Sequence, residues 1–379
     1  MTDIKIPLLI PQLPNREALW PYLGQIDEKQ HYSNFGPLVK RLESSLQQRF
    51  QLHAQIPLLV TTVSSATLGL ELALSALGLP KGTRVLVPAL TFVATLTAVI
   101  RAGYIPVVTD IDPDSWLLTP EIATEAAKSS DAGAVLAVAT FSQPQDTLLW
   151  HEFQKKTGIR VVIDAAAAFG SQWVQAPDIP VVFSMHATKS LAAGEGGFVV
   201  SGEQKNIGLV TQMSNFGINL DPLAHLPVGY LSSVGTNAKL SEYHAAVALA
   251  SLDGWDLMAA TRRAVAARYR QSLIAACGSA LIWQTGSEVA APTTFSVRVG
   301  SYAVRQKLED TCVKQGIATR RWYQPLLHQH AEKIEPLLSL PAHTAEAVAD
   351  DLIGLPFFAM MSDEQMTAIV NAVHSVVSS

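Results

Sequence analysis

The chain has 379 residues, of which 49% are hydrophobic and 16% charged, a balance typical of globular proteins with a sizeable core. Its net charge of −5 argues against a nucleic-acid partner, which would require a basic face. No apolar run is long enough to span a bilayer, so no membrane association is expected. Two cysteines form neither a disulfide framework nor a metal motif, and predict a reducing, cytoplasmic compartment.

Strand-like and helix-like patterns alternate between residues 56 and 201. This alternation predicts an α/β fold with a mostly parallel sheet. The predicted strands are residues 56–63, 84–88, 105–109, 134–139, 160–163, 179–183 and 198–200. The predicted helices between them include residues 68–77, 91–102 and 148–157.

The remaining sequence predicts a second, smaller domain, as expected at this length. Residues 211–234 are polar and rich in Gly and Pro, which predicts an active-site or interface loop. A helical region over 241–273, interrupted near Gly254, would connect a large domain (1–250) to a C-terminal domain (251–379). The C-terminal domain contains a predicted strand at 294–299 and predicted helices at 304–316 and 363–377.

Lys189 lies between an apolar strand-like run and a glycine-rich turn at 194–197. Desolvation of an ammonium group is costly, so burial lowers its pKa and makes the amine a nucleophile suited to Schiff-base chemistry. The alternative is a lysine that extends from a strand end to solvent. His186, three residues earlier, is a candidate substrate contact or a hydrogen-bonded structural histidine.

Asp164 ends the predicted strand at 160–163, and ligands of parallel α/β sheets bind beyond the carboxyl ends of strands. Alone it would be interpreted as a helix cap. Paired with Lys189, it indicates pyridoxal 5'-phosphate, which needs a lysine on its aldehyde and a carboxylate on its ring nitrogen. Residues 64–67 turn the chain into a helix whose free amides would bind the phosphate, unless they form only a plain cap.

In these residues and in several further motifs, the chain resembles the DegT-type (DegT/StrS) sugar aminotransferases, which are pyridoxal phosphate enzymes of fold type I. The resemblance runs in order through nearly the whole chain, and its specificity comes from the number and spacing of motifs. The segments that carry it are 33–43, 65–74, 87–95, 103–112, 164–166, 184–197 and 237–242. It implies a mostly parallel seven-stranded sheet in the large domain and a smaller α+β C-terminal domain.

The resemblance also implies residue roles. Lys189 would hold the cofactor as a Schiff base and shuttle a proton, and Asp164 would pair with the ring nitrogen. Phe92 matches an aromatic residue that stacks on the cofactor ring. The positions matching the phosphate site are Ala66, Thr67 and Ser184, together with Asn237 from a partner subunit. The active site would then exist only in a homodimer.

Four departures from the family pattern bear on the substrate. Ala167 stands where the family usually has Gln or His, which contacts the ring hydroxyl of the cofactor. Ala66 replaces a usual Gly, and Ala238 a usual Tyr. A C-terminal block of the family survives only loosely at residues 323–328. A related sugar-dehydrating branch carries His in place of the lysine, so Lys189 argues against that reaction.

The resulting prediction is a pyridoxal phosphate-dependent aminotransferase that moves an amino group from glutamate or glutamine to a nucleotide-linked keto-sugar in amino-sugar biosynthesis. Arg320 and Arg321, followed by Trp322 and Tyr323, would bind a diphosphate or carboxylate, or else form a solvated turn. The alternatives are another reaction of the same cofactor, such as cyclitol transamination or amino-aromatic precursor synthesis, and a non-catalytic ligand-binding homologue.

Overall fold

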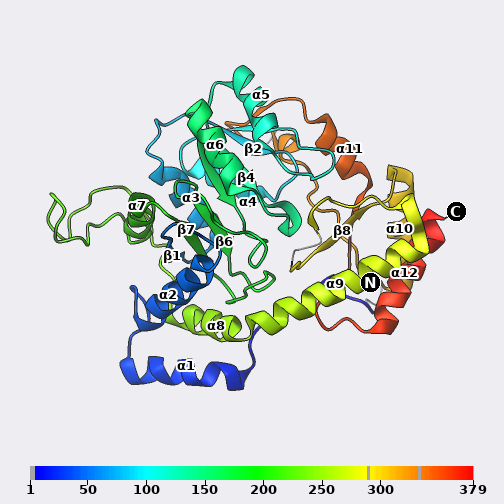
Figure 1. Cartoon of the computed structure of the whole chain (residues 1–379), viewed down its shortest axis with the longest axis horizontal. Helices are drawn as coiled ribbons and strands as arrows, with labels where there is room; N and C mark the ends of the chain where they lie inside the picture. Colours follow the sequence, from blue (N-terminus) through cyan, green and yellow to red (C-terminus); the bar gives the residue numbers. More distant parts are fainter. Residues whose placement is uncertain (1–4, 288–290, 332–333, 379) are drawn as a thin grey trace.

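A twisted eight-stranded sheet forms the centre of the molecule (Figure 1). The computed structural model describes residues 5–287, 291–331 and 334–378. The strand order is β1-β7-β6-β5-β4-β2-β3-β9. The strands are β1 (Leu59–Val63), β2 (Arg84–Pro88), β3 (Ile105–Thr109), β4 (Ala132–Val138), β5 (Arg160–Asp164), β6 (Val181–Ser184), β7 (Gly197–Ser201) and β9 (Leu338–Ser339). The seven strands expected from the sequence are joined by β9, a two-residue strand from the C-terminal part.

The directions of the strands determine which strand ends meet at each edge of the sheet. Neighbouring strands from β6 through β5, β4, β2, β3 to β9 run parallel, whereas β7 is antiparallel to β1 and to β6. In the β4–β5 register Val138 is opposite Asp164. The carboxyl ends of β4, β5 and β6 therefore meet at one edge, where a ligand of such a sheet binds.

Helices cover both faces of the sheet because its strands alternate buried side chains between two hydrophobic cores. Val161 and Ile163 of β5 join one core, and Val162 joins the other. Side chains of α2, α6 and α8 pack in the first core, and those of α3, α4 and α7 in the second. The helices of this part are α1 (Arg16–Lys29), α2 (Pro37–Gln51), α3 (Ala66–Ala76), α4 (Val93–Arg101), α5 (Pro120–Ser130), α6 (Thr147–Thr157), α7 (Gln204–Ser214) and α8 (Glu242–Asp253).

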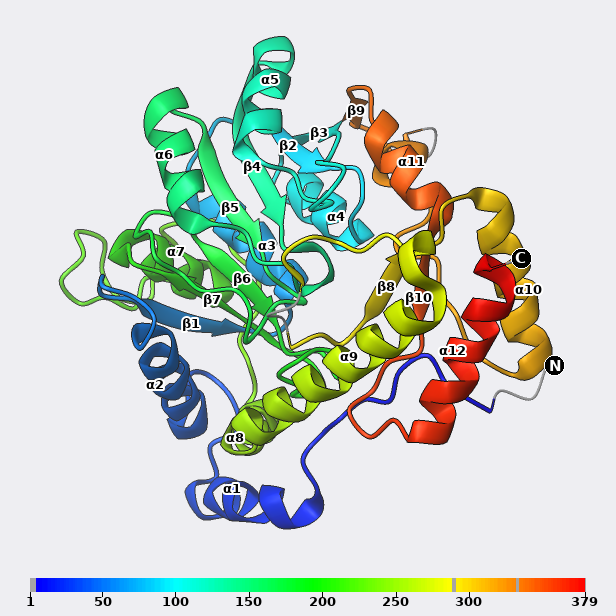
Figure 2. The same ribbon diagram turned by 45° about the vertical axis from the view of Figure 1, so that its right-hand side comes forward.

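The C-terminal part has a core of its own, visible beside the long helix α9 in Figure 2. An antiparallel pair of strands, β8 and β10, packs with α9, α10 and α12. These elements are α9 (Trp255–Cys277), β8 (Phe295–Arg298), α10 (Tyr302–Gln315), β10 (Leu352–Leu355) and α12 (Asp363–Val377). Helix α11 (His343–Asp351) instead joins the second core of the main sheet. The domain boundary at residue 250 stays a prediction.

Several element ends differ from the sequence prediction. The predicted loop at 211–234 starts later, because α7 continues to Ser214 with Ile207, Val210 and Met213 buried at helical spacing. Helix α3 begins at Ala66 rather than at residue 68, because Ser65 caps it. The helical region after residue 241 is interrupted at Gly254, as predicted. In the described chain, no helix combines the length and apolarity needed to cross a membrane.

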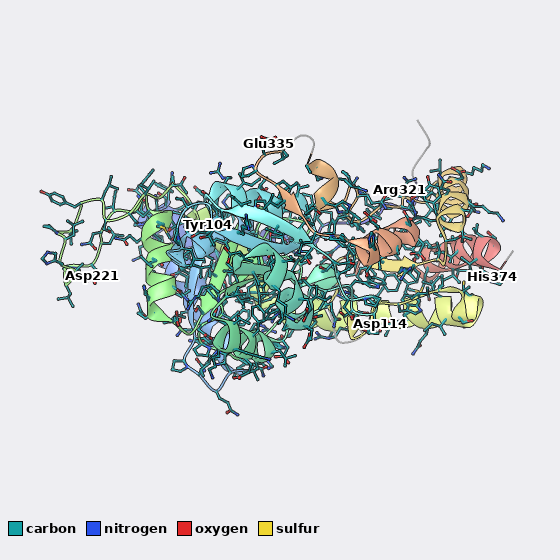
Figure 3. The ribbon with its side chains drawn as sticks, turned by 90° about the horizontal axis from the view of Figure 1, so that it is seen from above. Tyr104, Asp114, Asp221, Arg321, Glu335 and His374 are labelled. Atoms are coloured by element: carbon teal, nitrogen blue, oxygen red, sulfur yellow. The ribbon has the colours of Figure 1, made fainter. Side chains whose placement is uncertain are left out.

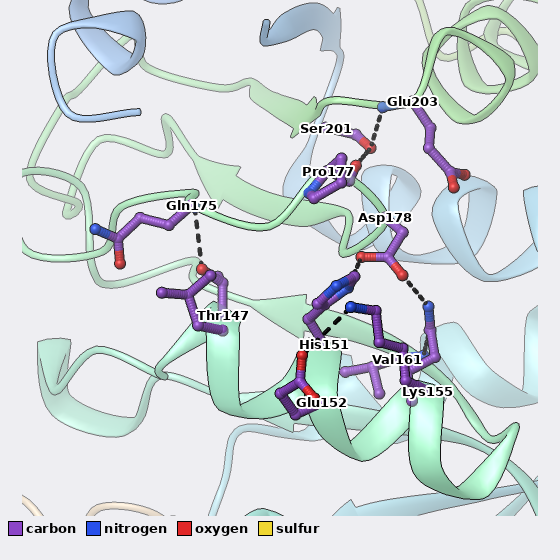
Figure 4. A network of polar contacts seen from close by, with 12 residues as sticks. Thr147, His151, Glu152, Lys155, Val161, Gln175, Pro177, Asp178, Ser201 and Glu203 are labelled. Atoms are coloured by element: carbon purple, nitrogen blue, oxygen red, sulfur yellow. Dashed lines mark hydrogen bonds and ion pairs between the residues drawn. The ribbon is translucent and has the colours of Figure 1, made fainter. Parts of the chain in front are cut away.

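A polar network at the amino ends of β5 and β6 fixes α6 to the sheet (Figure 4). Asp178 accepts hydrogen bonds from His151 and from Gln154 Nε2, both at 2.6 Å. Gln154 Oε1 in turn accepts from the amide of Val161 on β5, at 2.9 Å. The strand ends opposite to those that carry Asp164 and Ser184 are thus held by side-chain bonds, which keeps these two residues in register.

Candidate active site

A cavity of about 350 Å³ lies at the carboxyl ends of β4, β5 and β6, beside the amino ends of α3 and α4. Such a position is usual for ligands of α/β sheets. Eight of the eleven predicted site residues line it: Ala66, Thr67, Phe92, Asp164, Ser184, His186, Lys189 and Tyr323. Residues that are far apart in the chain therefore meet in one site.

Lys189 lies half-buried in the turn that follows β6. Its amide donates to the His186 carbonyl at 2.9 Å, and the next residue is held by Arg262, whose Nη1 donates to the Ser190 carbonyl at 2.9 Å. Burial lowers the pKa of the Lys189 amine, and the nearby Asp164 carboxylate opposes this shift. The fold thus provides a fixed amine with a larger neutral, nucleophilic fraction than a surface lysine has.

Asp164 is the last residue of β5 and is only 5% exposed. The amide of Ala166 donates to its Oδ1 at 3.1 Å, and Thr95 Oγ1 donates to its Oδ2 at 3.0 Å. Thr91 and Thr95 share a further hydroxyl–hydroxyl bond of 3.1 Å. Burial raises the pKa of the Asp164 carboxyl, while the two bonds and the charge of Lys189 act in the opposite direction. The carboxylate is thereby fixed in orientation within a poorly solvated site.

The amino end of α3 forms an anion cradle on the same cavity. Ser65 caps the helix by accepting from the Leu68 amide at 3.3 Å. The amides of Ala66 and Thr67 have no acceptor in the part of the chain that the structure describes. Gly197 lies directly below, where an added Cβ would be 2.7 Å from the Ala66 nitrogen. Free amides at a helix start, with the helix dipole, are suited to a phosphate group.

Aromatic rings form one wall of the cavity. Phe92 caps α4 with 58% of its surface exposed, and its ring centroid is 6.2 Å from that of Tyr323. Tyr323 also stacks on Phe141, at 5.3 Å between centroids and an interplanar angle of 5°. Burial, and secondarily the charge of Asp164, raise the pKa of the Tyr323 hydroxyl. Together these rings provide a flat apolar surface for a planar ligand.

Three predicted site residues do not line this cavity. Asn237 is exposed, and its Oδ1 accepts from Lys239 Nζ at 2.7 Å. The guanidinium of Arg320 lies 5.3 Å from the centre of the Trp322 ring. Arg321 forms a bidentate pair with Glu309 of α10, at 2.7 and 2.5 Å, and reaches the surface (Figure 3). The structure therefore gives Arg321 a local partner and does not bring it to the cavity.

His186 remains open to both roles that the sequence allowed. Its Nδ1 is 2.9 Å from Thr188 Oγ1, and its Nε2 is 3.7 Å from a Glu195 carboxylate oxygen. The side chains of His186 and Glu195 both line the cavity, and each is about half exposed. The ring is thus hydrogen-bonded locally and also accessible to a bound substrate.

The sequence analysis missed several polar residues of the site. Thr95 binds Asp164 directly, and Thr140 and Thr294 line the cavity with hydroxyls that have no hydrogen-bond partner among the described residues. The i,i+4 spacing of Thr91 and Thr95 after a buried strand was a usable signal for the first of these. Nothing local marked Thr140, because its burial depends on contacts with distant segments.

Comparison with known proteins identifies the chemistry of this site. A model of the DegT/DnrJ/EryC1/StrS aminotransferase family matches residues 15–374. The chain belongs to this family. Protein Rv3402c of Mycobacterium tuberculosis is 29% identical, with 97% of this chain and 89% of the relative aligned.

Solved structures agree with this assignment. A crystal structure from Bacillus cereus, assigned as a PLP-dependent aminotransferase, is 28% identical with a TM-score of 0.86, covering 97% of this chain and 99% of that one. DesI, solved in the presence of its TDP-sugar product, is 27% identical with a TM-score of 0.85, covering 100% and 95%. The expected fold type I architecture is thereby confirmed. This member of the DegT family is a pyridoxal phosphate-dependent aminotransferase.

The cavity fits this cofactor. Its open amide cradle at α3, a buried carboxylate at the neighbouring strand end and a lysine with a lowered pKa are the groups that pyridoxal phosphate requires. The orphaned hydroxyl of Thr140 adds an unused hydrogen-bond donor to the lining. The replacement of the usual Gln or His by Ala167 removes one contact and leaves the other groups in place.

Proposed function

We propose that this aminotransferase moves an amino group from glutamate or glutamine to the ketone of a nucleotide-linked keto-sugar. The observation that carries the proposal is the meeting of Lys189 and Asp164 in one cavity, next to the open amides of α3. The likeness to DesI, whose structure contains a TDP-sugar product, supports the nucleotide-linked substrate. Amino-sugar biosynthesis is the process that such a reaction serves.

Each residue would then have a defined task. When bound, pyridoxal phosphate supplies an aldehyde and an electron-accepting ring. Lys189 Nζ would hold the cofactor until the amino donor displaces it. The freed amine would then move a proton from the donor Cα to the aldehyde carbon of the cofactor, and in the second half-reaction from that carbon to the sugar carbon that receives the nitrogen. Asp164 would pair with the ring nitrogen, and its bonds from Thr95 and Ala166 favour its ionised form. Phe92, which lines the cavity, would cover one face of the ring and exclude water from it.

The phosphate would be held by the start of α3 and the end of β6. The amides of Ala66 and Thr67 donate no hydrogen bond within the described chain, and the helix dipole adds a partial positive charge. Ser184 Oγ accepts from the amide of His186 at 3.2 Å, so its own proton is free to be donated. These groups anchor the cofactor while its aldehyde end reaches Lys189.

The substrate side of the cavity is rich in hydroxyl groups and aromatic faces. Tyr323, His186 and Glu195 border it, which suits a ring with several hydroxyl groups. Among the described residues that line the cavity, Lys189 is the only lysine or arginine. We therefore expect the diphosphate of the substrate to bind outside this lining, with groups near the mouth or from a second protomer.

A second copy of the chain would complete the site. The loop after α7 projects from the body of the molecule, with Asp221 near its tip (Figures 1 and 3). It exposes large apolar side chains: Leu223 is 92% exposed, Tyr230 62% and Val234 94%. Such exposure is typical of an interface that is covered in an assembly. We propose a homodimer in which this loop brings Asn237 to the phosphate of the partner's site.

A donor and acceptor panel tests the proposal. Purified protein with pyridoxal phosphate is offered glutamate or glutamine, and then a TDP-linked keto-sugar, the free keto-sugar, a keto-cyclitol or a cyclic aromatic precursor. Amination of the TDP-linked sugar by wild type, its loss in Lys189→Ala and its retention in the exposed-lysine control Lys156→Ala would support the proposal. Amination of only the cyclitol or the aromatic precursor would establish the corresponding alternative. Binding without any amination would indicate a ligand-binding protein.

A further inference from the structure

Ala167 leaves one side of the cofactor site without the side chain that the family usually has there. It lies three residues after Asp164 and lines the cavity with a methyl group. Its carbonyl is already bound by Ser142 Oγ, at 2.5 Å. The Ala167 side chain is a methyl group and therefore has no donor of its own to offer to a ligand.

Thr140 has an unused donor close to this position. It is 2% exposed, it lines the cavity, and its Oγ1 has no partner among the described residues. Its backbone is fixed, since the Thr140 carbonyl accepts from the Gln143 amide at 3.1 Å and from Gln284 Nε2 at 3.2 Å. A buried hydroxyl without a partner is unfavourable, so a ligand atom that binds it would remove this penalty.

The order of the strands places Thr140 on a particular side of the cofactor. Ser184 ends β6, Asp164 ends β5, and Thr140 follows the end of β4 by two residues, with β5 in the middle. Ala139, which lies between the end of β4 and Thr140, is held by a hydrogen bond from its amide to the Asp164 carbonyl, at 2.9 Å. In the proposed function the phosphate would lie toward α3 and β6, and the ring nitrogen would face Asp164 at the end of β5.

In pyridoxal phosphate the phosphate arm and the ring oxygen lie on opposite sides of the aldehyde carbon. With the phosphate toward β6 and the nitrogen at β5, the ring oxygen would face β4, the next strand in the sheet. We propose that the Thr140 hydroxyl donates a hydrogen bond to this ring oxygen, in place of the side chain missing at Ala167. This inference rests on the proposed function. The donor function has thus moved from the end of β5 to the end of β4.

This contact has a spectroscopic consequence. A donor on the ring oxygen stabilises its negative charge and so lowers the proton affinity of the adjacent nitrogen that joins Lys189 to the cofactor. The pH midpoint of the absorption band of the lysine-bound cofactor reports that affinity. The other titratable residues that line the cavity are Asp164, His186, Glu195 and Tyr323, and all remain unchanged in the variants below.

The test compares pH titrations of the cofactor-loaded full chain. Thr140→Val keeps the side-chain volume, whereas Thr140→Ala reduces it. We expect both to raise the midpoint by about one pH unit, a tenfold change in proton affinity. Thr140→Ser, which keeps the hydroxyl, should titrate like wild type. Ser296→Ala is the matched control, because it removes an equally unpaired buried hydroxyl from β8, outside the cavity lining.

Restoration of the family's usual donor provides a second measurement. Ala167→Gln on the Thr140→Val background should return the midpoint toward the wild-type value. Cofactor-loaded Thr140→Val and Thr140→Ala with wild-type midpoints would overturn the inference and leave the proposed function intact. A wild-type protein without any cofactor band would overturn both.

Discussion

At the scale of single residues, Asp164 is a charge that the fold holds in an unfavourable place. Burial raises the pKa of its carboxyl above the ordinary value of 3.8, even though Thr95, Ala166 and Lys189 all favour the ionised form. At neutral pH the folded protein therefore bears the penalty of a desolvated carboxylate. Active sites commonly combine function with such local instability.

Replacement of Asp164 by Asn should separate stability from activity. We expect Asp164→Asn without cofactor to be more stable at pH 7 by about 1 kcal/mol, because the buried charge is removed. The folded pKa is raised, so the wild-type penalty is complete above that pKa and decreases as the pH falls toward 3.8. The stability difference should therefore vanish at acidic pH, as measured by chemical unfolding over a pH series.

The same variant should lose at least about two orders of magnitude in transamination rate, since a charge-assisted contact to the ring nitrogen is absent. Asp114→Asn, which removes an exposed carboxylate, serves as the control for charge alone. An Asp164→Asn enzyme with wild-type turnover would contradict the assigned role.

At the scale of elements, the contact between β7 and α3 shapes the phosphate cradle. Gly197 lets the sheet approach the first turn of α3, since a Cβ there would be 2.7 Å from the Ala66 nitrogen and 2.8 Å from the Phe183 oxygen. Both neighbours are backbone atoms, which cannot move aside as a side-chain tip can. The position of the free amides therefore depends on the absence of a side chain at residue 197.

We expect Gly197→Ala to weaken pyridoxal phosphate binding at least about tenfold and to destabilise the fold by about 1–3 kcal/mol, as overpacking usually does. Cofactor titration and thermal unfolding measure the two effects. The control is Gly208→Ala on α7, where an added Cβ meets nothing within 4 Å and should slightly stabilise the helix. Equal cofactor affinity in both variants would show that the cradle does not depend on this contact.

The elements also show what the sequence could predict. Strands β2, β3 and β6 contain continuous apolar runs, so their positions follow from the local sequence alone. The position of Lys189 and Asp164 in one cavity was predictable because each follows such a run, whereas their roles stay predictions. The direction of Arg321 was not, because Glu309 on another element captures its guanidinium. The unpaired state of Thr140 likewise depends on long-range packing that no local pattern encodes.

At the scale of the whole molecule, the exposed loop after α7 is the feature that a single chain does not explain. Its apolar side chains face solvent, and Asn237 at its base lies outside the cavity of its own chain. A homodimer would cover these side chains and could place Asn237 in the partner's site. The phosphate site would then be shared between two protomers.

Mixing two defective proteins tests this sharing. Lys189→Ala should be inactive, and Asn237→Ala should bind cofactor weakly. If Asn237 acts on the partner's site, each mixed dimer has one intact site, so an exchanged equimolar mixture should recover about a quarter of wild-type activity. If Asn237 acts within its own chain, or if the protein is a monomer, mixing should produce no gain over the average of the two variants.

The central claim is that Lys189 and Asp164 form a working pyridoxal phosphate site, and an absorption spectrum tests it most directly. Purified protein is titrated with pyridoxal phosphate and then given glutamate, in parallel with Lys189→Ala. The account predicts a yellow cofactor band in wild type that glutamate converts to the pyridoxamine form, and no such band in the variant. A wild-type spectrum without the band, or a band that persists in Lys189→Ala, would contradict it.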